Sequence, residues 1–169
     1  MLEITIYSIG GQGGVTAAKL LALSALYDGK YSQAIPQFGP ERRGALVTSY
    51  VRISDEVIRK HSRIRNPDII VIFDVKNKIG VNSKIAILNS KNNITLNAEK
   101  IYCIDANKIA SDLGLIKEGL PIINTAMVGA TAKICNISLN SVKKAIADEI
   151  KDERNVKAAE IAYEVVKCD

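Results

Sequence analysis

The pattern of apolar and polar positions divides the chain into a first part rich in strands and a later part rich in helices. Residues 3–9 alternate apolar with polar or aromatic side chains and run into a cluster of glycines, which predicts a strand. Residues 15–28 are then almost continuously apolar and are followed by Gly29, which predicts a helix closed by a left-handed glycine. Because so few polar side chains interrupt this helix, we expect it to be covered on more than the sheet side, by a partner subunit or by further helices of the same chain.

Further strands and helices follow from the same patterns. The segment between the second and third strands, residues 37–45, is too short for a crossover helix, so these two strands are predicted to be antiparallel. Residues 68–74 are continuously apolar between two aspartates, which is typical of a central strand covered on both faces. The additional strands are expected at 30–36, 46–53, 68–74, 84–89 and 100–105, and the helices at 106–113, 124–135, 138–150 and 154–167.

These elements predict one domain over residues 1–169. We expect a three-layer α/β/α fold with a mixed, mostly parallel sheet, a glycine turn after the first strand and a helical C-terminal part. Apolar residues make up 47% and charged residues 24% of the chain, which is typical of a soluble globular protein. There is no basic leader at the start and no apolar run of membrane-spanning length, so we expect a cytoplasmic protein that does not enter a membrane.

Charge and cysteine usage exclude several function classes. The net charge is +5, but the basic residues are spread along the chain apart from one cluster at 59–65, so nucleic-acid binding is not expected. Cys103, Cys135 and Cys168 lie far apart, no CxxC motif exists, and His61 is the single histidine. We therefore expect neither a zinc site nor a cysteine-ligated iron–sulfur cluster in this chain, and the thiols should be reduced and mostly buried.

Residues 8–14, SIGGQGG, place four glycines where a strand passes into a helix. The N–H groups of such a turn form a concavity for an anion at the helix N-terminus. In the dinucleotide-binding fingerprint, Ser8 would replace the first glycine, and the acidic residue that holds the ribose is missing because Asp28 precedes the second strand. Lys19 does not fit the Walker pattern either. The turn therefore indicates either tight strand-to-helix packing or an anion site, with NAD or FAD as a remote alternative.

A second unusual segment, PQFGPERRGA at residues 36–45, is stiffened by prolines and glycines. The side chains of Arg42 and Arg43 cannot easily face the same way on an extended backbone. We therefore expect one arginine to pair with Glu41 and the other to face an anion or a partner carboxylate. The alternative is an ordinary surface loop with weak ion pairs.

Taken together, these segments resemble the gamma subunit of 2-oxoacid:ferredoxin oxidoreductases. The resemblance covers roughly residues 3–135, and the form FGPERRGA is closer to the pyruvate members than to the 2-oxoglutarate members. The chain departs from the family pattern at Ser8, where a glycine is common and serine would narrow the turn, and at Leu46, where a proline is common. The segments that carry the resemblance are GGQGGVTAAKLLA, DGKYSQAIPQFGPERRGA, VRISDEVI, NPDIIVIFD and NTAMVGATA.

The resemblance implies a subunit of a multi-subunit pyruvate:ferredoxin oxidoreductase, or pyruvate synthase, of anaerobic metabolism. Such a complex converts pyruvate, coenzyme A and oxidised ferredoxin into acetyl-CoA, CO2 and reduced ferredoxin. Thiamine diphosphate would lie between alpha and beta subunits, and the iron–sulfur clusters largely in a delta-type subunit. The gamma chain would contribute a coenzyme A-facing surface and subunit contacts, so the isolated chain should be inactive. If its apolar helix is exposed, it should form a homo-oligomer.

Two alternatives stay open. The chain could be the gamma-type subunit for 2-oxoglutarate, a branched 2-oxoacid or indolepyruvate, since substrate choice would rest mainly on other subunits. More remotely, it could be a stand-alone dinucleotide-binding enzyme.

Coenzyme A carries phosphates but needs no ribose-holding acidic residue of the NAD kind. The expected donors to it are the N–H groups of the glycine turn and one of the two arginines, while the Gln12 side chain would contact the pantetheine amides. No catalytic residue and no metal ligand is expected. The candidate cofactor-binding residues are Gly10, Gly11, Gln12, Gly13, Gly14, Arg42, Arg43 and Asn124.

Overall fold

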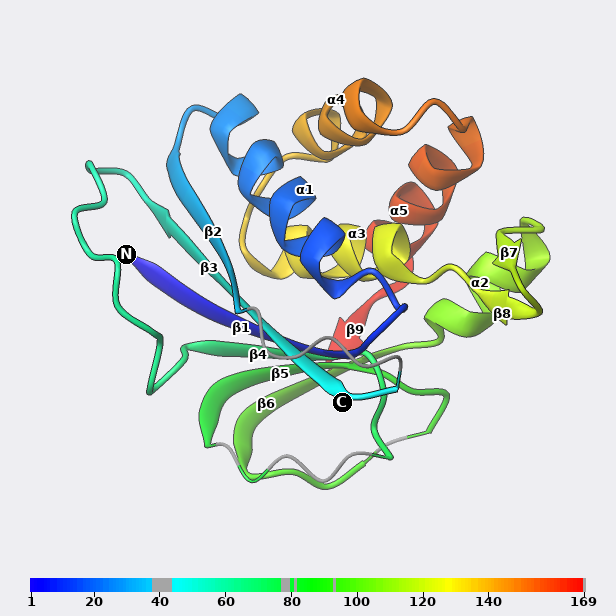
Figure 1. Cartoon of the computed structure of the whole chain (residues 1–169), viewed down its shortest axis with the longest axis horizontal. Coiled ribbons are helices and arrows are strands. Elements are labelled where there is room, and N and C mark those ends of the chain that lie inside the picture. Colours follow the sequence, from blue (N-terminus) through cyan, green and yellow to red (C-terminus); the bar gives the residue numbers. More distant parts are fainter. Residues whose placement is uncertain (38–43, 77–79, 81, 93, 169) are drawn as a thin grey trace.

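The computed structural model shows a seven-stranded mixed sheet with helices packed on it (Figure 1). It describes residues 1–37, 44–76, 80, 82–92 and 94–168. The strand order is β2-β3-β1-β4-β5-β6-β9, and β7 and β8 form a separate small hairpin. The strands are β1 (Leu2–Ile9), β2 (Tyr31–Gln37), β3 (Leu46–Ser54), β4 (Ile69–Ile72), β5 (Ser83–Asn89), β6 (Ala98–Ile104), β7 (Ile116–Lys117), β8 (Leu120–Pro121) and β9 (Lys167–Cys168). The helices are α1 (Gly14–Tyr27), α2 (Ala106–Asp112), α3 (Asn124–Ile134), α4 (Leu139–Glu149) and α5 (Glu153–Val165).

The first strand, β1, lies inside the sheet at the point where the strand direction changes. It pairs antiparallel with β3, and its last residue Ile9 is opposite Leu46. On its other side it pairs parallel with β4, and β5 and β6 continue in the same direction. The pairing of β2 with β3 is antiparallel, as predicted from the short connection between them. The carboxyl ends of β1, β4, β5 and β6 therefore meet at one edge of the sheet.

Helix α1 is covered by other parts of the same chain. It packs against β2 and β3 on its sheet side and against α3 and α4 on the others, so residues such as Leu20, Leu21 and Ala25 are buried. The sequence left open whether a partner subunit or further helices of the same chain cover this helix, and the structure shows that α3 and α4 cover it. The large apolar side chains that stay exposed, Leu26 and Tyr27, lie at its last turn. The expected homo-oligomer depended on an exposed apolar helix, and α1 does not provide one.

The α/β fold with its mixed, mostly parallel sheet, glycine turn and helical C-terminal part is confirmed. The layers differ from the expected α/β/α arrangement, because the described helices gather on one face of the sheet (Figure 1). The other face carries a smaller apolar cluster that includes Ile70 and Leu88, and the non-helical residue Ile94 packs against it. The connections at 73–82 and 90–97 are too short for an ordinary crossover helix, which explains why no helix is described on that face.

Small residues bring α3 and α5 into close contact. A Cβ atom added to Gly129 would overlap the main-chain carbonyl of Ala159. The Thr125 hydroxyl donates a hydrogen bond of 3.1 Å to Asn155 Oδ1 between the same two helices. The C-terminal helix is shorter than the 154–167 predicted, since α5 ends at Val165 and the chain continues into β9. No helix in the described part of the chain is both long and apolar enough to cross a membrane.

Candidate functional site

The glycine turn joins the carboxyl end of β1 to the start of α1, and Gln12 holds it in shape. The Gln12 main-chain N–H donates to the Ile9 carbonyl over 3.0 Å, and the Gln12 side-chain Oε1 accepts from the Ile9 N–H over 2.7 Å. The carbonyl end of this side chain is thus used within the turn. Its amide NH2 is the part left for a ligand. In the predicted contact with pantetheine, Gln12 would therefore act as a hydrogen-bond donor to a carbonyl of that group.

Several main-chain N–H groups of the turn have no acceptor in the part of the chain that the structure describes. Gly11 (φ +95°) and Gly13 (φ +80°) adopt left-handed conformations that favour glycine, and Gly13 is the N-cap of α1 without a side-chain cap. The N–H groups of Gly11, Gly13 and Gly14 donate to no acceptor among the described residues. Such a helix N-terminus carries partial positive charge and unpaired donors, which suits it to an anion.

Ser8 lies beneath this turn. Its side chain is 2% exposed, and a Cβ atom added to Gly14 would lie 2.7 Å from Ser8 Cβ and still closer to Ser8 Oγ. Ser8 therefore fills the space between β1 and the start of α1, on the buried side of the turn. In contrast, an added Cβ at Gly11 would meet nothing within 4 Å, so the turn is open there. Tight packing explains Gly14, while the outer side of the turn stays accessible.

Asn124 joins the site from the start of α3. A Cβ atom added to Gly13 would lie 2.7 Å from Asn124 Nδ2, so the side chain packs directly against the turn. Asn124 is only 8% exposed, and its Oδ1 accepts from the Thr125 N–H over 2.9 Å. Its Nδ2 has no acceptor in the described part of the chain. The structure thus brings the N-termini of two helices together with one unpaired amide donor between them.

The end of the segment PQFGPERRGA, at Ala45, lies beside the glycine turn. The Gly10 N–H donates to the Ala45 carbonyl over 2.8 Å, directly before β3 begins. Arg42 and Arg43 lie outside the described residues, so their pairing with Glu41 and their contact with an anion stay predictions. The contact between the glycine turn and the Ala45 carbonyl could not be predicted from residue types, because every residue has a main-chain carbonyl. An antiparallel pairing of the first and third strands would have predicted this contact.

Two other polar side chains at this edge of the sheet have structural roles. Asn89 donates from Nδ2 to the Phe73 carbonyl over 3.0 Å and accepts from the Ala106 N–H over 3.0 Å. Asp105 caps α2 by accepting from the Lys108 N–H over 2.9 Å. These two side chains are therefore engaged within the protein, whereas the glycine turn and Asn124 keep donors that no described residue accepts from.

Asp28, the acidic residue considered for a ribose contact, has a structural role. It follows α1, and its Oδ1 accepts from the Ser138 N–H over 3.3 Å and the Ser141 hydroxyl over 3.0 Å at the start of α4. The hydrogen bonds from Ser138, with those from Ser141 and the charge of Lys30, lower the pKa of this carboxyl despite its partial burial. Asp28 therefore links the end of α1 to the start of α4.

The three cysteines differ in burial. Cys135 is buried, and burial raises the pKa of its thiol to about 12, while Cys103 is half-buried and Cys168 is exposed. The expectation of mostly buried thiols is therefore wrong, because it holds for Cys135 alone. No group of three His, Cys, Asp or Glu side chains that could hold a metal ion occurs among the described residues.

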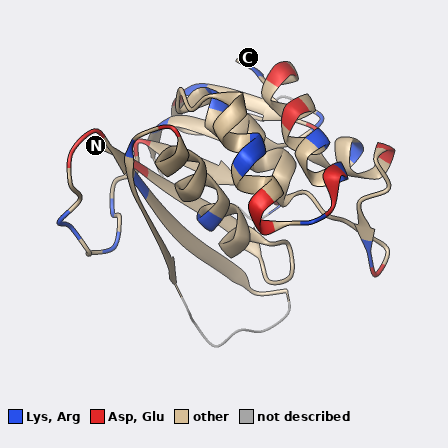
Figure 2. Ribbon diagram, turned by 90° about the horizontal axis from the view of Figure 1, so that it is seen from above, with Lys and Arg blue, Asp and Glu red and all other residues tan. Residues whose placement is uncertain are grey.

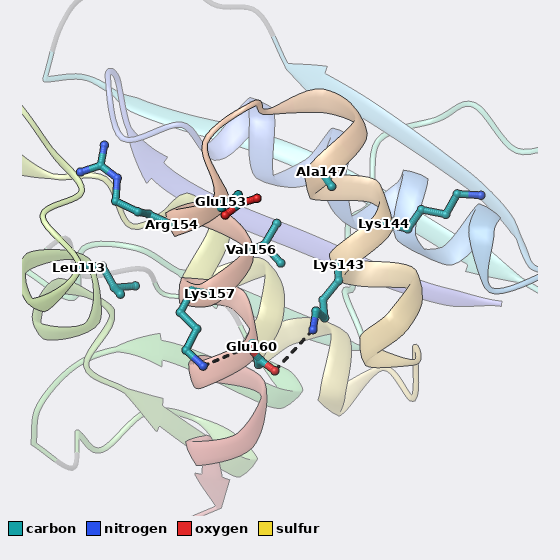
Figure 3. Close-up of a pocket in the computed structure, with 9 residues that line it drawn as sticks. All are labelled: Leu113, Lys143, Lys144, Ala147, Glu153, Arg154, Val156, Lys157 and Glu160. Atoms are coloured by element: carbon teal, nitrogen blue, oxygen red, sulfur yellow. Dashed lines mark hydrogen bonds and ion pairs between the residues drawn. The ribbon is translucent and has the colours of Figure 1, made fainter.

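A separate groove of about 710 Å³ lies between α4 and α5 (Figure 3). Its apolar lining includes Ala147 and Val156, and Glu160 on its rim pairs with Lys143 at 3.5 Å and Lys157 at 3.3 Å. The groove contains none of the candidate residues from the sequence, and these rim charges are paired with one another. We therefore locate the candidate site at the glycine turn.

Comparison with known proteins places this geometry in a family. Residues 3–165 match the family described as pyruvate ferredoxin/flavodoxin oxidoreductase. The chain is 45% identical to the pyruvate synthase subunit PorC of Methanocaldococcus jannaschii, with 96% of each chain covered. It is 38% identical to the pyruvate/ketoisovalerate oxidoreductases common subunit gamma of Pyrococcus furiosus, with 97% of this chain and 96% of that protein covered.

Solved structures agree with the fold. The pyruvate oxidoreductase subunit PORC of Thermotoga maritima superposes with a TM-score of 0.81 at 31% identity, over 99% of this chain and 98% of that one. A 2-oxoglutarate:ferredoxin oxidoreductase from Magnetococcus marinus, solved with 2-oxoglutarate, coenzyme A and succinyl-CoA bound, superposes with a TM-score of 0.70 at 19% identity. That match covers 96% of this chain but 30% of the other, so it shows a shared fold within a longer chain.

Proposed function

The chain belongs to the pyruvate ferredoxin/flavodoxin oxidoreductase family, and we propose that it is the gamma subunit of a multi-subunit pyruvate:ferredoxin oxidoreductase. The complex oxidises pyruvate with coenzyme A to acetyl-CoA and CO2 and passes two electrons to ferredoxin. The similarity to PorC subunits along almost the whole chain supports this assignment. In this proposal residues 1–169 form one gamma-type domain.

The role of this chain in the complex is to face coenzyme A with the glycine turn. The observation that carries this role is the group of unpaired N–H donors at Gly11, Gly13 and Gly14, with Asn124 Nδ2 beside them. A phosphate of coenzyme A would accept from these donors, where the partial charge of α1 also favours an anion. The amide NH2 of Gln12 and the side chain of Arg42 or Arg43 would add further contacts.

The chemistry itself belongs to other subunits. The decarboxylation chemistry would be supplied by thiamine diphosphate held between the alpha and beta subunits, and electron transfer by iron–sulfur clusters in a delta-type subunit. This chain would orient coenzyme A and contact its partner subunits, in the cytoplasm and without binding nucleic acid or membrane.

A gamma chain shared between two oxidoreductases is the second candidate function. The relative from Pyrococcus furiosus is a subunit common to pyruvate and ketoisovalerate oxidoreductases. Because of this relative, we take a branched 2-oxoacid such as ketoisovalerate as the alternative substrate. Purifying the tagged chain from its native host, identifying the co-purified subunits and assaying them with a panel of 2-oxoacids distinguishes the two.

Asn124→Asp tests the coenzyme A-facing role. The carboxylate can still accept from the Thr125 N–H at the start of α3, so the fold should be retained, but it loses the Nδ2 donor and brings a negative charge beside Gly13. We expect the KM of the complex for coenzyme A to rise about tenfold, equivalent to roughly 1.4 kcal/mol, with the KM for pyruvate unchanged. Steady-state kinetics of the assembled complex measure both.

The control is Asn140→Asp, which makes the same charge change on the exposed face of α4. An Asn124→Asp complex with an unchanged KM for coenzyme A would contradict the role of the turn. Replacing Arg42 and Arg43 together by alanine tests the loop in the same assay. If that variant alters neither the KM for coenzyme A nor assembly of the complex, the loop has no part in the site.

A further inference from the structure

The segment between β3 and β4 is held against the sheet by a buried arginine. Arg52 is 1% exposed, although arginine is rarely buried completely. Its guanidinium donates to the carbonyls of Lys60 and Ser62, at 3.4 and 2.5 Å. It also donates to Gln33 Oε1 over 3.1 Å on the neighbouring strand. A segment without helix or strand is thereby fixed at two points of its backbone.

The charge of Arg52 is compensated inside the same cluster. Its Nε pairs with Glu3 Oε1 at 2.8 Å, and Lys60 Nζ reaches the same oxygen at 3.1 Å. Burial alone would raise the pKa of Glu3, but the hydrogen bonds from Arg52 and Lys60 outweigh it and lower that pKa. A buried charge is stable only when paired and hydrogen-bonded, so this cluster is a fixed support for the segment.

The supported segment presents basic side chains to solvent. Ile64 is buried against the protein, while Arg59, Lys60, Arg63 and Arg65 around it are exposed. Arg59 and Arg65 form no ion pair with any described residue. Figure 2 shows the segment as a loop beside the N-terminus whose charged residues are acidic at its start and then basic.

A hollow of about 500 Å³ lies at the start of this segment. Most of its lining is polar or charged and consists of Ser54, Asp55, Glu56, Arg59 and Lys60. The apolar part of the lining includes Met1 and Val57, which are 59% and 60% exposed. The segment follows the end of β3 that pairs with the start of β1, so it lies at the sheet edge opposite the glycine turn.

We propose that residues 55–65 are a docking surface for another subunit of the complex, one that packs an apolar side chain on the exposed Met1 and Val57 and places carboxylates against Arg59 and Arg65. Protein–protein interfaces combine apolar contacts with a polar rim and are enriched in methionine and arginine. The acidic Asp55 and Glu56 in the hollow would repel a nucleic-acid backbone, so a protein surface fits better. The fixed backbone at Lys60 and Ser62 reduces the conformational entropy lost on docking. This inference rests on the proposed function, because the partner is a subunit of the same enzyme.

The test compares assembly of the native complex around three tagged chains: wild type, R59E/R65E, and the matched control K117E/K151E. Lys117 and Lys151 are exposed and form no ion pair with a described residue, so the control makes the same change in net charge elsewhere. We expect R59E/R65E to lose at least tenfold in the amount of partner subunits recovered at 150 mM salt. The control should recover the wild-type amount, and both variants should keep the wild-type circular dichroism and melting temperature.

A conservative variant identifies the contact directly. R59K/R65K keeps the charge and should assemble, and carbodiimide should then couple the new lysines to carboxylates of one partner subunit, as found by mass spectrometry of the complex. If R59E/R65E recovers the wild-type amount of partner subunits, the docking surface is wrong but the proposed function stands. The same holds if R59E/R65E assembles normally but loses binding of the wild-type chain to a 30-base-pair DNA. A wild-type chain that recovers no other subunit would overturn both this inference and the proposed function.

Discussion

The contact between Ser8 and Gly14 determines the shape of the candidate site at the scale of single residues. Ser8 occupies the buried side of the turn, and Gly14 passes over it without room for a side chain. The turn is open at Gly11, where an added Cβ would meet nothing within 4 Å. A residue that looked from the sequence like a substitution within an anion site is therefore part of the packing that supports it.

Gly14→Ala should destabilise the chain because its new methyl group would overlap Ser8. Overpacking of this kind costs about 1–3 kcal/mol of unfolding free energy. Ser8→Gly in the same chain removes the overlapping atoms and leaves only Ile6 Cγ2 nearby, at 3.9 Å from the added Cβ. The double variant should therefore recover stability, with a coupling energy of about 1 kcal/mol or more in urea unfolding. Thr16→Ala, at an exposed position of the same helix, serves as the control, and additive effects of the first two changes would argue against the contact.

Asn124 shows the limit of prediction at this scale. It was selected from a segment that resembles the family, and its distance along the chain gave no reason to place it beside Gly13. Their approach depends on how α3 lies across the start of α1, which is set by packing between helices. The glycine turn, by contrast, could be predicted because its local chemistry requires glycine.

At the scale of elements, the helices are tied together by their ends as well as by their apolar faces. Asp28 at the end of α1 accepts two hydrogen bonds at the start of α4, and Ser138 caps α4 itself by accepting from the Ser141 N–H. The predicted start of that helix was found at the same residue. The link from Asp28, more than a hundred positions earlier, is tertiary and left no local pattern.

The Asp28 link predicts a pH-dependent contribution to stability. Because the folded pKa lies below the ordinary value of 3.8, the contribution is present above that pH and is lost as pH falls through the folded pKa. We expect Asp28→Asn to lower the unfolding free energy by about 1 kcal/mol at pH 7, with this difference shrinking at pH 3. Urea unfolding at the two pH values measures it. Glu149→Gln, at an exposed carboxylate of α4, is the control. If Asp28→Asn lowers the unfolding free energy by the same amount at both pH values, the link is refuted.

Long apolar or alternating segments could be assigned to strands and helices from the sequence, and short elements could not. The strands from β1 to β6 and the five helices were each expected near their observed positions. The two-residue strands β7, β8 and β9 form through pairing with distant or turn-linked partners, so no periodicity precedes them. A charged side chain such as Arg52 is ordinarily exposed, but the segment at residues 55–65, which Arg52 holds by hydrogen bonds, buries it.

For the molecule as a whole, the two edges of the sheet have different proposed tasks. The glycine turn and Asn124 would face coenzyme A at the carboxyl ends of the parallel strands, where ligands of open α/β sheets commonly bind. Residues 55–65 would hold a neighbouring subunit at the opposite edge. The family assignment could be reached from the sequence, but this separation required the pairing of β1 with β3.

The whole chain, purified alone, should oxidise no pyruvate in the presence of coenzyme A and an electron acceptor. In the division of labour proposed above, this chain contributes donors and surfaces, while other subunits supply the groups that break the carbon–carbon bond and carry electrons. Adding it to a preparation of the partner subunits that lacks it should restore ferredoxin reduction, measured spectrophotometrically. Turnover by the isolated chain would show that the division of labour proposed above is wrong.

The burial of α1 also has a consequence for synthesis on the ribosome. This helix emerges early, whereas α3 and α4, which cover it, follow about a hundred residues later, or roughly 5–20 s at ordinary elongation rates. During that interval the surface of α1 that α3 and α4 later cover has no partner within the nascent polypeptide, although β2 and β3 can already pack on its sheet side. The order of elements along the chain therefore leaves this apolar surface open to solvent or to a chaperone until the last third of the chain has been translated.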